Sequence, residues 1–170
     1  MDKIKGIPYS KEVPCNFEIE RVMLTTCFHD EVNGLLGRLD IEDFVDYLHR
    51  LLFKAFLEMD DRNIPFEIQA LHELLDTPEY AQEKKRCGVH EEHSLNGAAD
   101  NVLAEFINPA NFEYYFRKLR SDRMRRWLMR TSDKIKEKAR DPLTDPIDTL
   151  RWIIWNSKKT IRVSKLEVEV

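Results

Sequence analysis

The longest uninterrupted helical pattern in the chain lies between residues 110 and 141. No glycine or proline occurs in that stretch, and apolar side chains recur at steps of three and four residues, as on one face of an α-helix. They are Phe112, Tyr115, Phe116, Leu119, Met124, Trp127, Leu128 and Ile135. Such a helix would be about 45 Å long, whereas an average helix has only ~11–12 residues. We therefore expect it to extend away from a compact head and to need a partner for its apolar stripe.

A second helix is predicted to follow this one and to return antiparallel to it. The segment DPLTDP (141–146) interrupts the pattern, and it places Asp145 as an N-cap ahead of Pro146 at the first helical position. We expect the return helix to pack through Ile153 and Ile154, on a face shared with Ile147 and Leu150. Two helices joined by a short polar turn are typical of an antiparallel hairpin. We assign residues 110–158 to that hairpin and predict self-association through Phe112, Tyr115, Phe116, Leu119, Trp127, Leu128 and Ile135.

Residues 16–109 predict a helical head. The clearest pattern there consists of Leu48, Leu51, Leu52, Ala55, Phe56 and Met59. Asn16, Asp40 and Ser94 are candidate N-caps, and both Pro65 and Pro78 are predicted at first helical positions. The 5 glycines are too few for an all-β sandwich rich in tight turns. We therefore predict an all-α fold, a small helical-bundle head with a protruding antiparallel helical hairpin.

The two ends of the chain carry weaker patterns. Residues 1–15 show little periodicity and predict an extended arm. In residues 159–170 the apolar side chains alternate, which predicts a flexible or strand-like tail.

The net charge of −4 hides a strong division along the chain. Residues 1–116 hold 11 Lys/Arg and 23 Asp/Glu, whereas residues 117–140 hold 11 Lys/Arg and 3 Asp/Glu. The basic helix either meets acidic neighbours of its own chain or forms a contact surface for nucleic acid or an acidic partner. Arg123, Arg125, Arg126 and Arg130 are the candidate nucleic-acid contacts. Because the interleaved aromatics share the apolar stripe, we expect them to be packed in a core or dimer interface, and direct DNA binding to be weak or absent.

The sequence offers little sign of catalytic chemistry. It has no GxxxxGK[ST] phosphate-binding loop, and we predict no catalytic, cofactor-binding or metal-binding residues. A minor alternative is a metal-dependent enzyme using Cys87, His90 and His93, but the C-x2-H-x2-H spacing does not match two separated ligand pairs, and a polar loop is the simpler interpretation. The 3 cysteines are widely spaced, which favours a reduced cytosolic compartment. The sequence contains no run of ~18 apolar residues, so we predict no membrane span.

Taken together, several segments between residues 13 and 155 resemble the N-terminal domain of the DnaB-type replicative DNA helicases. The most specific is HRLLFKAF (49–56) with the following Ile64-Pro65-Phe66-Glu67. The weaker segments are Val13-Pro14 with Glu18, Glu20, Val22 and Leu24; Asp43-Phe44; Asn108-Pro109-Ala110-Asn111 with Tyr115; and Leu119-Arg120 with Arg125-Arg126-Trp127-Leu128.

The resemblance implies a non-catalytic domain of the DNA replication machinery. Such domains pair through their hairpins, three dimers build a hexameric collar, and the collar binds primase or a helicase loader. By this resemblance the partners are a second copy of the chain and a primase or loader, in the bacterial cytoplasm near the nucleoid. The family's ATPase motor is not in this sequence, so we interpret the chain as a helicase fragment or a free-standing relative. The alternative function is a nucleic-acid-binding module that uses the basic helix 117–140.

Overall fold

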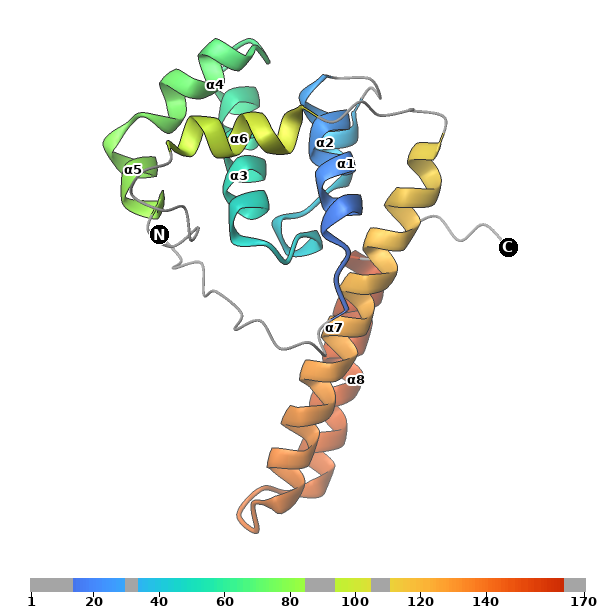
Figure 1. The fold of residues 1–170 in the computed structure, drawn as a ribbon. Coiled ribbons are helices and arrows are strands. Elements are labelled where there is room, and N and C mark those ends of the chain that lie inside the picture. The colour runs from blue at the N-terminus through green and yellow to red at the C-terminus, as the bar shows by residue number, and fades with distance from the viewer. Residues whose placement is uncertain (1–13, 30–33, 85–93, 105–110, 164–170) are drawn as a thin grey trace. The chain divides into compact units, whose positions relative to one another are not determined.

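A computed structural model describes residues 14–29, 34–84, 94–104 and 111–163 (Figure 1). In these ranges it contains eight α-helices, one 3-10 helix and no strand, which confirms the predicted all-α class. The chain divides into two compact units, residues 1–123 and 124–170. The predicted boundary at residue 109 is earlier than this division, because the first three turns of the longest helix belong to the first unit.

The first unit is built around one central helix, α3. The elements of this unit are α1 (Phe17–Phe28), α2 (Leu35–Arg38), the 3-10 helix η1 (Ile41–Asp43), α3 (Tyr47–Asp61), α4 (Ile68–Leu75), α5 (Pro78–Lys84), α6 (Leu95–Leu103) and the beginning of α7 (Phe112–Arg140). Helix α3 contacts α1, η1 and α4, while α6 contacts α1 and α4. Five of the six residues of the predicted apolar stripe on α3 are 0% exposed, and they form the core of this unit: Leu51, Leu52, Ala55, Phe56 and Met59. Leu48 is only half-buried, and Phe53, outside the predicted stripe, is 0% exposed as well.

Local sequence signals fix several helix starts. The side chain of Asn16 accepts a hydrogen bond from the Ile19 N–H at 3.1 Å, and that of Ser94 accepts one from the Gly97 N–H at 2.9 Å. Asp40 and Asp43 form a reciprocal capping box around η1. The predicted role of Pro65 is wrong: α4 begins at Ile68, and Pro65 lies in the extended connection before it.

Helix α3 ends in a C-cap that is formed by the polar residues following it. Asn63 adopts a left-handed conformation with φ 53°. The Ile64 N–H donates to the Met59 carbonyl at 2.8 Å, and the Asn63 N–H donates to the Asp60 carbonyl at 3.1 Å. These two bonds form a Schellman motif with asparagine at the position that glycine usually occupies.

The second unit is a helical hairpin. The second part of α7 and α8 (Pro146–Val163) run antiparallel and are joined by a short turn (Figure 1). Asp145 caps α8 by accepting the Ile147 N–H at 2.8 Å, as predicted. Helix α8 continues to Val163, so the prediction of a flexible or strand-like tail is wrong for residues 159–163, and residues 164–170 lie outside the described part. None of the described helices is long and apolar enough to cross a bilayer.

Candidate interaction surfaces

The first turns of α7 use their aromatic residues inside the first unit. The rings of Phe112 and Phe116 stack with their centroids 5.8 Å apart, and both side chains are buried. The guanidinium of Arg38 lies 5.2 Å from the centre of the Phe112 ring and 4.5 Å from that of Phe116, in a cation–π arrangement. Leu119 is buried as well. These three residues are therefore packed within the chain, which corrects their assignment to self-association.

Two arginines of α7 meet the acidic segment around η1. Nη1 of Arg120 lies 3.3 Å from Oδ1 of Asp43, and Nη1 of Arg123 lies 3.2 Å from the same oxygen. Arg123 also reaches Asp40 at 3.3 Å and Glu42 at 3.6 Å. Part of the basic helix thus meets acidic neighbours of its own chain. We therefore withdraw Arg123 as a candidate nucleic-acid contact, because three carboxylates already surround its guanidinium.

Burial changes the titration of this cluster. Desolvation raises the pKa of Asp43, and the neighbouring Arg120 and Arg123 oppose that change without reversing it. Desolvation also lowers the pKa of Arg120, against the attraction of Asp43. For Arg123, burial lowers the pKa, but Asp43, Asp40 and Glu42 together outweigh it and the pKa is raised. The cluster is a structural network around the buried Asp43, and its members are already paired.

A second buried polar group joins α1 to the start of α3. The carboxylate of Glu20 accepts hydrogen bonds from the Val45 N–H at 2.9 Å and the Asp46 N–H at 3.2 Å. Its Oε2 also lies 2.8 Å from Nδ1 of the buried His49. Each carboxylate oxygen is used, as a buried charge requires. We assign this group to the architecture of the first unit rather than to chemistry.

The hairpin carries large apolar side chains that are exposed to solvent. Ile147, Leu150 and Ile154 on α8 are 57%, 58% and 56% exposed. Their spacing of three and four residues places them on one face of the helix. We call these three residues the α8 stripe. Trp155 on α8 and Leu128 and Met129 on α7 are exposed too.

The face of α8 that packs within the hairpin is different from the predicted one. Thr149 is buried, and Trp152, Ile153 and Asn156 are half-buried. Ile153 therefore agrees with the prediction, but Ile154 does not. An amphipathic pattern shows which residues share a face, yet it does not say whether that face meets the neighbouring helix or solvent.

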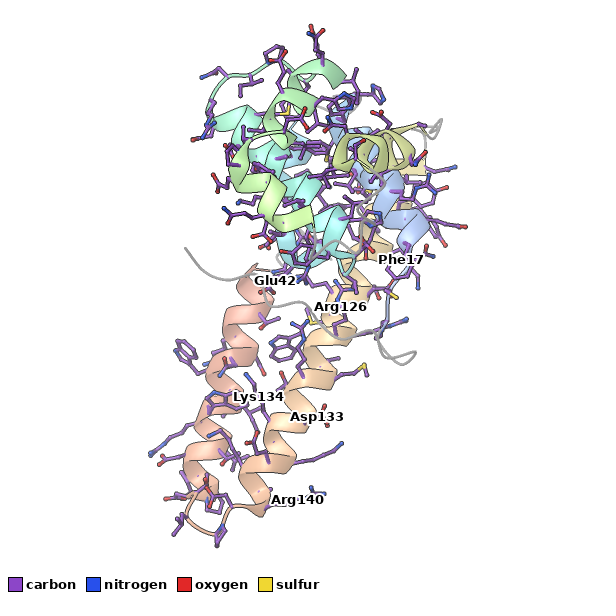
Figure 2. All side chains as sticks on the ribbon, turned by 60° about the vertical axis from the view of Figure 1, so that its left-hand side comes forward. Phe17, Glu42, Arg126, Asp133, Lys134 and Arg140 are labelled. Carbon is purple, nitrogen blue, oxygen red and sulfur yellow. The ribbon has the colours of Figure 1, made fainter. Side chains whose placement is uncertain are left out.

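The remaining predicted residues separate into two groups. Arg126 is buried, whereas Arg125 and Arg130 are exposed. The prediction that Arg126 contacts nucleic acid is wrong, because its side chain is buried. Tyr115, Trp127 and Ile135 are half-buried. Figure 2 shows Arg126 and, farther along α7, Asp133, Lys134 and Arg140.

Metal binding at the 87–94 loop lies outside what the structure tests. Cys87, His90 and His93 fall outside the described residues. In the described part of the chain, no three His, Cys, Asp or Glu side chains gather as a metal site would require.

Comparison with known families identifies the first unit. The family model of the DnaB-like helicase N terminal domain matches residues 12–121. The chain belongs to this family. A comparison with curated proteins gives no match. The DnaB-like domain is the non-motor part of a replicative helicase, and it is an oligomerisation domain in the context of DNA replication. The hairpin from residue 122 onward lies beyond the matched range.

The most specific DnaB-like segment consists mainly of core residues. In HRLLFKAF, five consecutive side chains from His49 to Phe53 are buried, and so are Ala55 and Phe56. Two further structural residues carried weaker signals. Glu20 belongs to the first DnaB-like segment, yet its partners lie 25 to 29 residues away, and Asp43 meets arginines about 80 residues away. Local patterns do not contain such pairings.

Proposed function

We propose that this DnaB-like chain is a non-catalytic oligomerisation and partner-binding domain in bacterial DNA replication, and that it pairs with a second copy through the hairpin of residues 124–163. The α8 stripe is the observation that carries the proposal. Its three large apolar side chains are exposed on one face of α8, and a second hairpin can cover this apolar surface. Leu128, Trp127 and Ile135 on α7 remain in the proposed contact, whereas Tyr115 belongs to the first unit and is not part of it. We place the protein in the cytoplasm, associated with the nucleoid.

The test is the oligomeric state of a variant that carries charges in the stripe. Leu150→Asp with Ile154→Asp should convert a concentration-dependent dimer into a monomer in light scattering. The double variant Leu57→Asp with Ile68→Asp is the matched control, because these residues are also partly exposed but lie on α3 and α4. The control should keep the parent mass. Helical circular dichroism should be preserved in both variants.

The opposite pattern would overturn the self-association surface. A parent chain that stays monomeric at ~100 μM would contradict it, because micromolar affinities are ordinary for such interfaces. If the α8 stripe variant stays dimeric and the variant with aspartates on α3 and α4 becomes monomeric, the self-association surface lies on the first unit.

The partner is proposed to be a primase or a helicase loader, and the larger assembly a hexamer made of three dimers. The family membership supports both proposals. Binding of a purified primase to the parent chain, measured by calorimetry, should be compared with binding to the stripe variant. Loss of the dimer together with loss of primase binding would indicate that the partner recognises the paired hairpins.

The nucleic-acid alternative keeps only part of its predicted surface. Arg123 is enclosed by carboxylates and Arg126 is buried, while Arg125 and Arg130 remain exposed. We therefore expect single-stranded DNA to bind no more tightly than ~10 μM at physiological salt, in the non-specific range. A submicromolar affinity that Arg125→Glu with Arg130→Glu abolishes would favour the alternative.

A further inference from the structure

The two edges of the α8 stripe differ in chemistry. At 3.6 residues per turn, Lys158 and Arg151 lie about 20° and 40° around the helix from Ile147, and Trp155 lies about 80° from it on the same side. On the other side the stripe is followed by Ser157, which carries no charge. We call Arg151 and Lys158 the cationic edge of the stripe. The exposed face of α8 thus contains an apolar strip, a row of cations and a tryptophan.

Both cations of this edge can still take an anion. Arg151 lies 3.2 Å from Asp148 on the same helix, but these side chains are 77% and 68% exposed, and ion pairs in water are weak. Lys158 is exposed, and no carboxylate of the described residues pairs with it. Trp155 beside them is 64% exposed. An anionic partner can therefore meet the cations and the tryptophan from the same side.

The packing of the hairpin leaves this face open. Helix α8 lies along the second part of α7 (Figure 1), and its packed residues Thr149, Trp152 and Asn156 are on the side opposite to the stripe. The described part of the hairpin, residues 124–163, holds 11 Lys/Arg and 5 Asp/Glu, a net charge of +6. A large anionic surface can therefore approach the stripe without meeting a negatively charged hairpin.

We propose that the outer face of α8 binds the surface of an anionic lipid bilayer, which takes the place of the second copy on the stripe. The stripe enters the boundary between headgroups and acyl chains, the cationic edge meets lipid phosphates, and Trp155 lies at headgroup level. A second copy covers the apolar strip, whereas an anionic bilayer matches the strip, the cations and the tryptophan together. Such a helix lies on the bilayer and does not span it. The proposal rests on the proposed function, because the bilayer regulates pairing by competing for the same stripe.

The first measurement is cosedimentation of the full chain with lipid vesicles. The chain should bind vesicles that contain phosphatidylglycerol and phosphatidylcholine, and it should bind vesicles of phosphatidylcholine alone much more weakly. Leu150→Asp with Ile154→Asp should abolish binding, because charged side chains cannot enter the acyl boundary. Leu57→Asp with Ile68→Asp, which adds the same charge to the first unit, should retain most of it. Equal binding of these two variants would overturn the proposal.

The second measurement separates the cationic edge from the general positive charge of the hairpin. Arg151→Gln with Lys158→Gln should lower the vesicle affinity roughly 25-fold, because each cation near an anionic surface contributes about fivefold. Arg130→Gln with Lys136→Gln is the matched control. It removes the same charge from α7, and Lys136 forms a surface ion pair on its own helix as Arg151 does. The control should lose less than about threefold, because salt screens charges outside the contact. Both variants should keep the parent mass in light scattering.

The third measurement tests the competition between the bilayer and the second copy. An excess of phosphatidylglycerol vesicles should lower the amount of dimer that a lysine cross-linker captures. A dimer that persists at saturating lipid would overturn the proposal, and so would an equal loss for the two pairs of cations. A chain that forms dimers but does not bind vesicles would overturn this inference and leave the proposed function standing. A monomer that binds vesicles through the stripe would do the reverse.

Discussion

Glu20 shows how one residue can hold two helices in place. Its carboxylate accepts the N–H groups of Val45 and Asp46 just ahead of α3, and it contacts His49 in the first turn of that helix. It therefore holds from α1 the N-cap residue Asp46, whose own side chain accepts the Leu48 and His49 N–H groups of the first turn of α3. A buried carboxylate with this many partners is costly to alter.

The first prediction concerns Glu20. Glu20→Gln replaces one acceptor oxygen by an amide group that faces donors, and it should lower the free energy of unfolding by about 1–3 kcal/mol. Glu18→Gln is the control, because Glu18 is an exposed residue of the same helix, and it should change stability by less than about 0.5 kcal/mol. Urea unfolding of both variants measures the difference. Equal effects would mean that the Glu20 contacts add nothing.

The second prediction concerns the pH dependence that Asp43 introduces. Its pKa is raised by burial above the ordinary value of 3.8, so the folded state binds more protons than the unfolded state in the range above that value. The stability contribution of Asp43 is therefore full below pH 3.8 and falls as the pH rises through the folded pKa. Asp43→Asn removes this titration. Accordingly, the stability of the parent chain relative to Asp43→Asn should decrease with rising pH.

Urea unfolding of both proteins across this range measures that difference. A difference that grows with pH would show that Arg120 and Arg123 dominate and lower the pKa instead.

At the scale of the elements, the end of α3 gives a third prediction. Asn63 has a positive φ, which costs an ordinary side chain about 1–2 kcal/mol. Asn63→Ala should lower the free energy of unfolding by about 1 kcal/mol, whereas Asn63→Gly should leave it equal or slightly higher. Thermal unfolding of both variants measures the order. If alanine is tolerated as well as glycine, the left-handed turn is not required.

Helix starts could be predicted from the sequence, but the surroundings of helix faces could not. Asn16, Ser94 and Asp145 were predictable caps, because an N-cap bonds to residues two or three positions later. The burial of Phe112 and Phe116 depends on Arg38, more than 70 residues earlier in the chain. Ile154 was misplaced because its side chain lies on the exposed face of α8 and not on the face that packs within the hairpin. The apolar alternation in residues 159–170 predicted a strand, but α8 continues to Val163.

At the scale of the whole molecule, the two units differ in composition. Residues 124–170 hold 12 Lys/Arg and 7 Asp/Glu, a net charge of +5, whereas the first 123 residues have a net charge of −9. The family match ends at residue 121, close to the division between the units. The large apolar core lies in the first unit, and the exposed stripe lies in the second.

The last prediction is that the first unit folds without the second. A chain that ends at Arg123 retains the Arg120 and Arg123 contacts to Asp43, so it should unfold cooperatively and remain helical. Without the hairpin it should be a monomer at concentrations where the full chain is a dimer. Circular dichroism and light scattering test the two statements. A dimer of residues 1–123 would place the self-association surface in the head.

The positions of the tryptophans give the molecule an internal optical probe. All 3 of them, Trp127, Trp152 and Trp155, lie beyond residue 123, and the first unit holds none. Emission excited at wavelengths that tyrosine does not absorb therefore reports on the hairpin alone. Far-ultraviolet dichroism sums the helices of both units. When the protein is unfolded, coincident curves from the two signals would indicate one cooperative body, and separate curves would give the hairpin its own stability without any label.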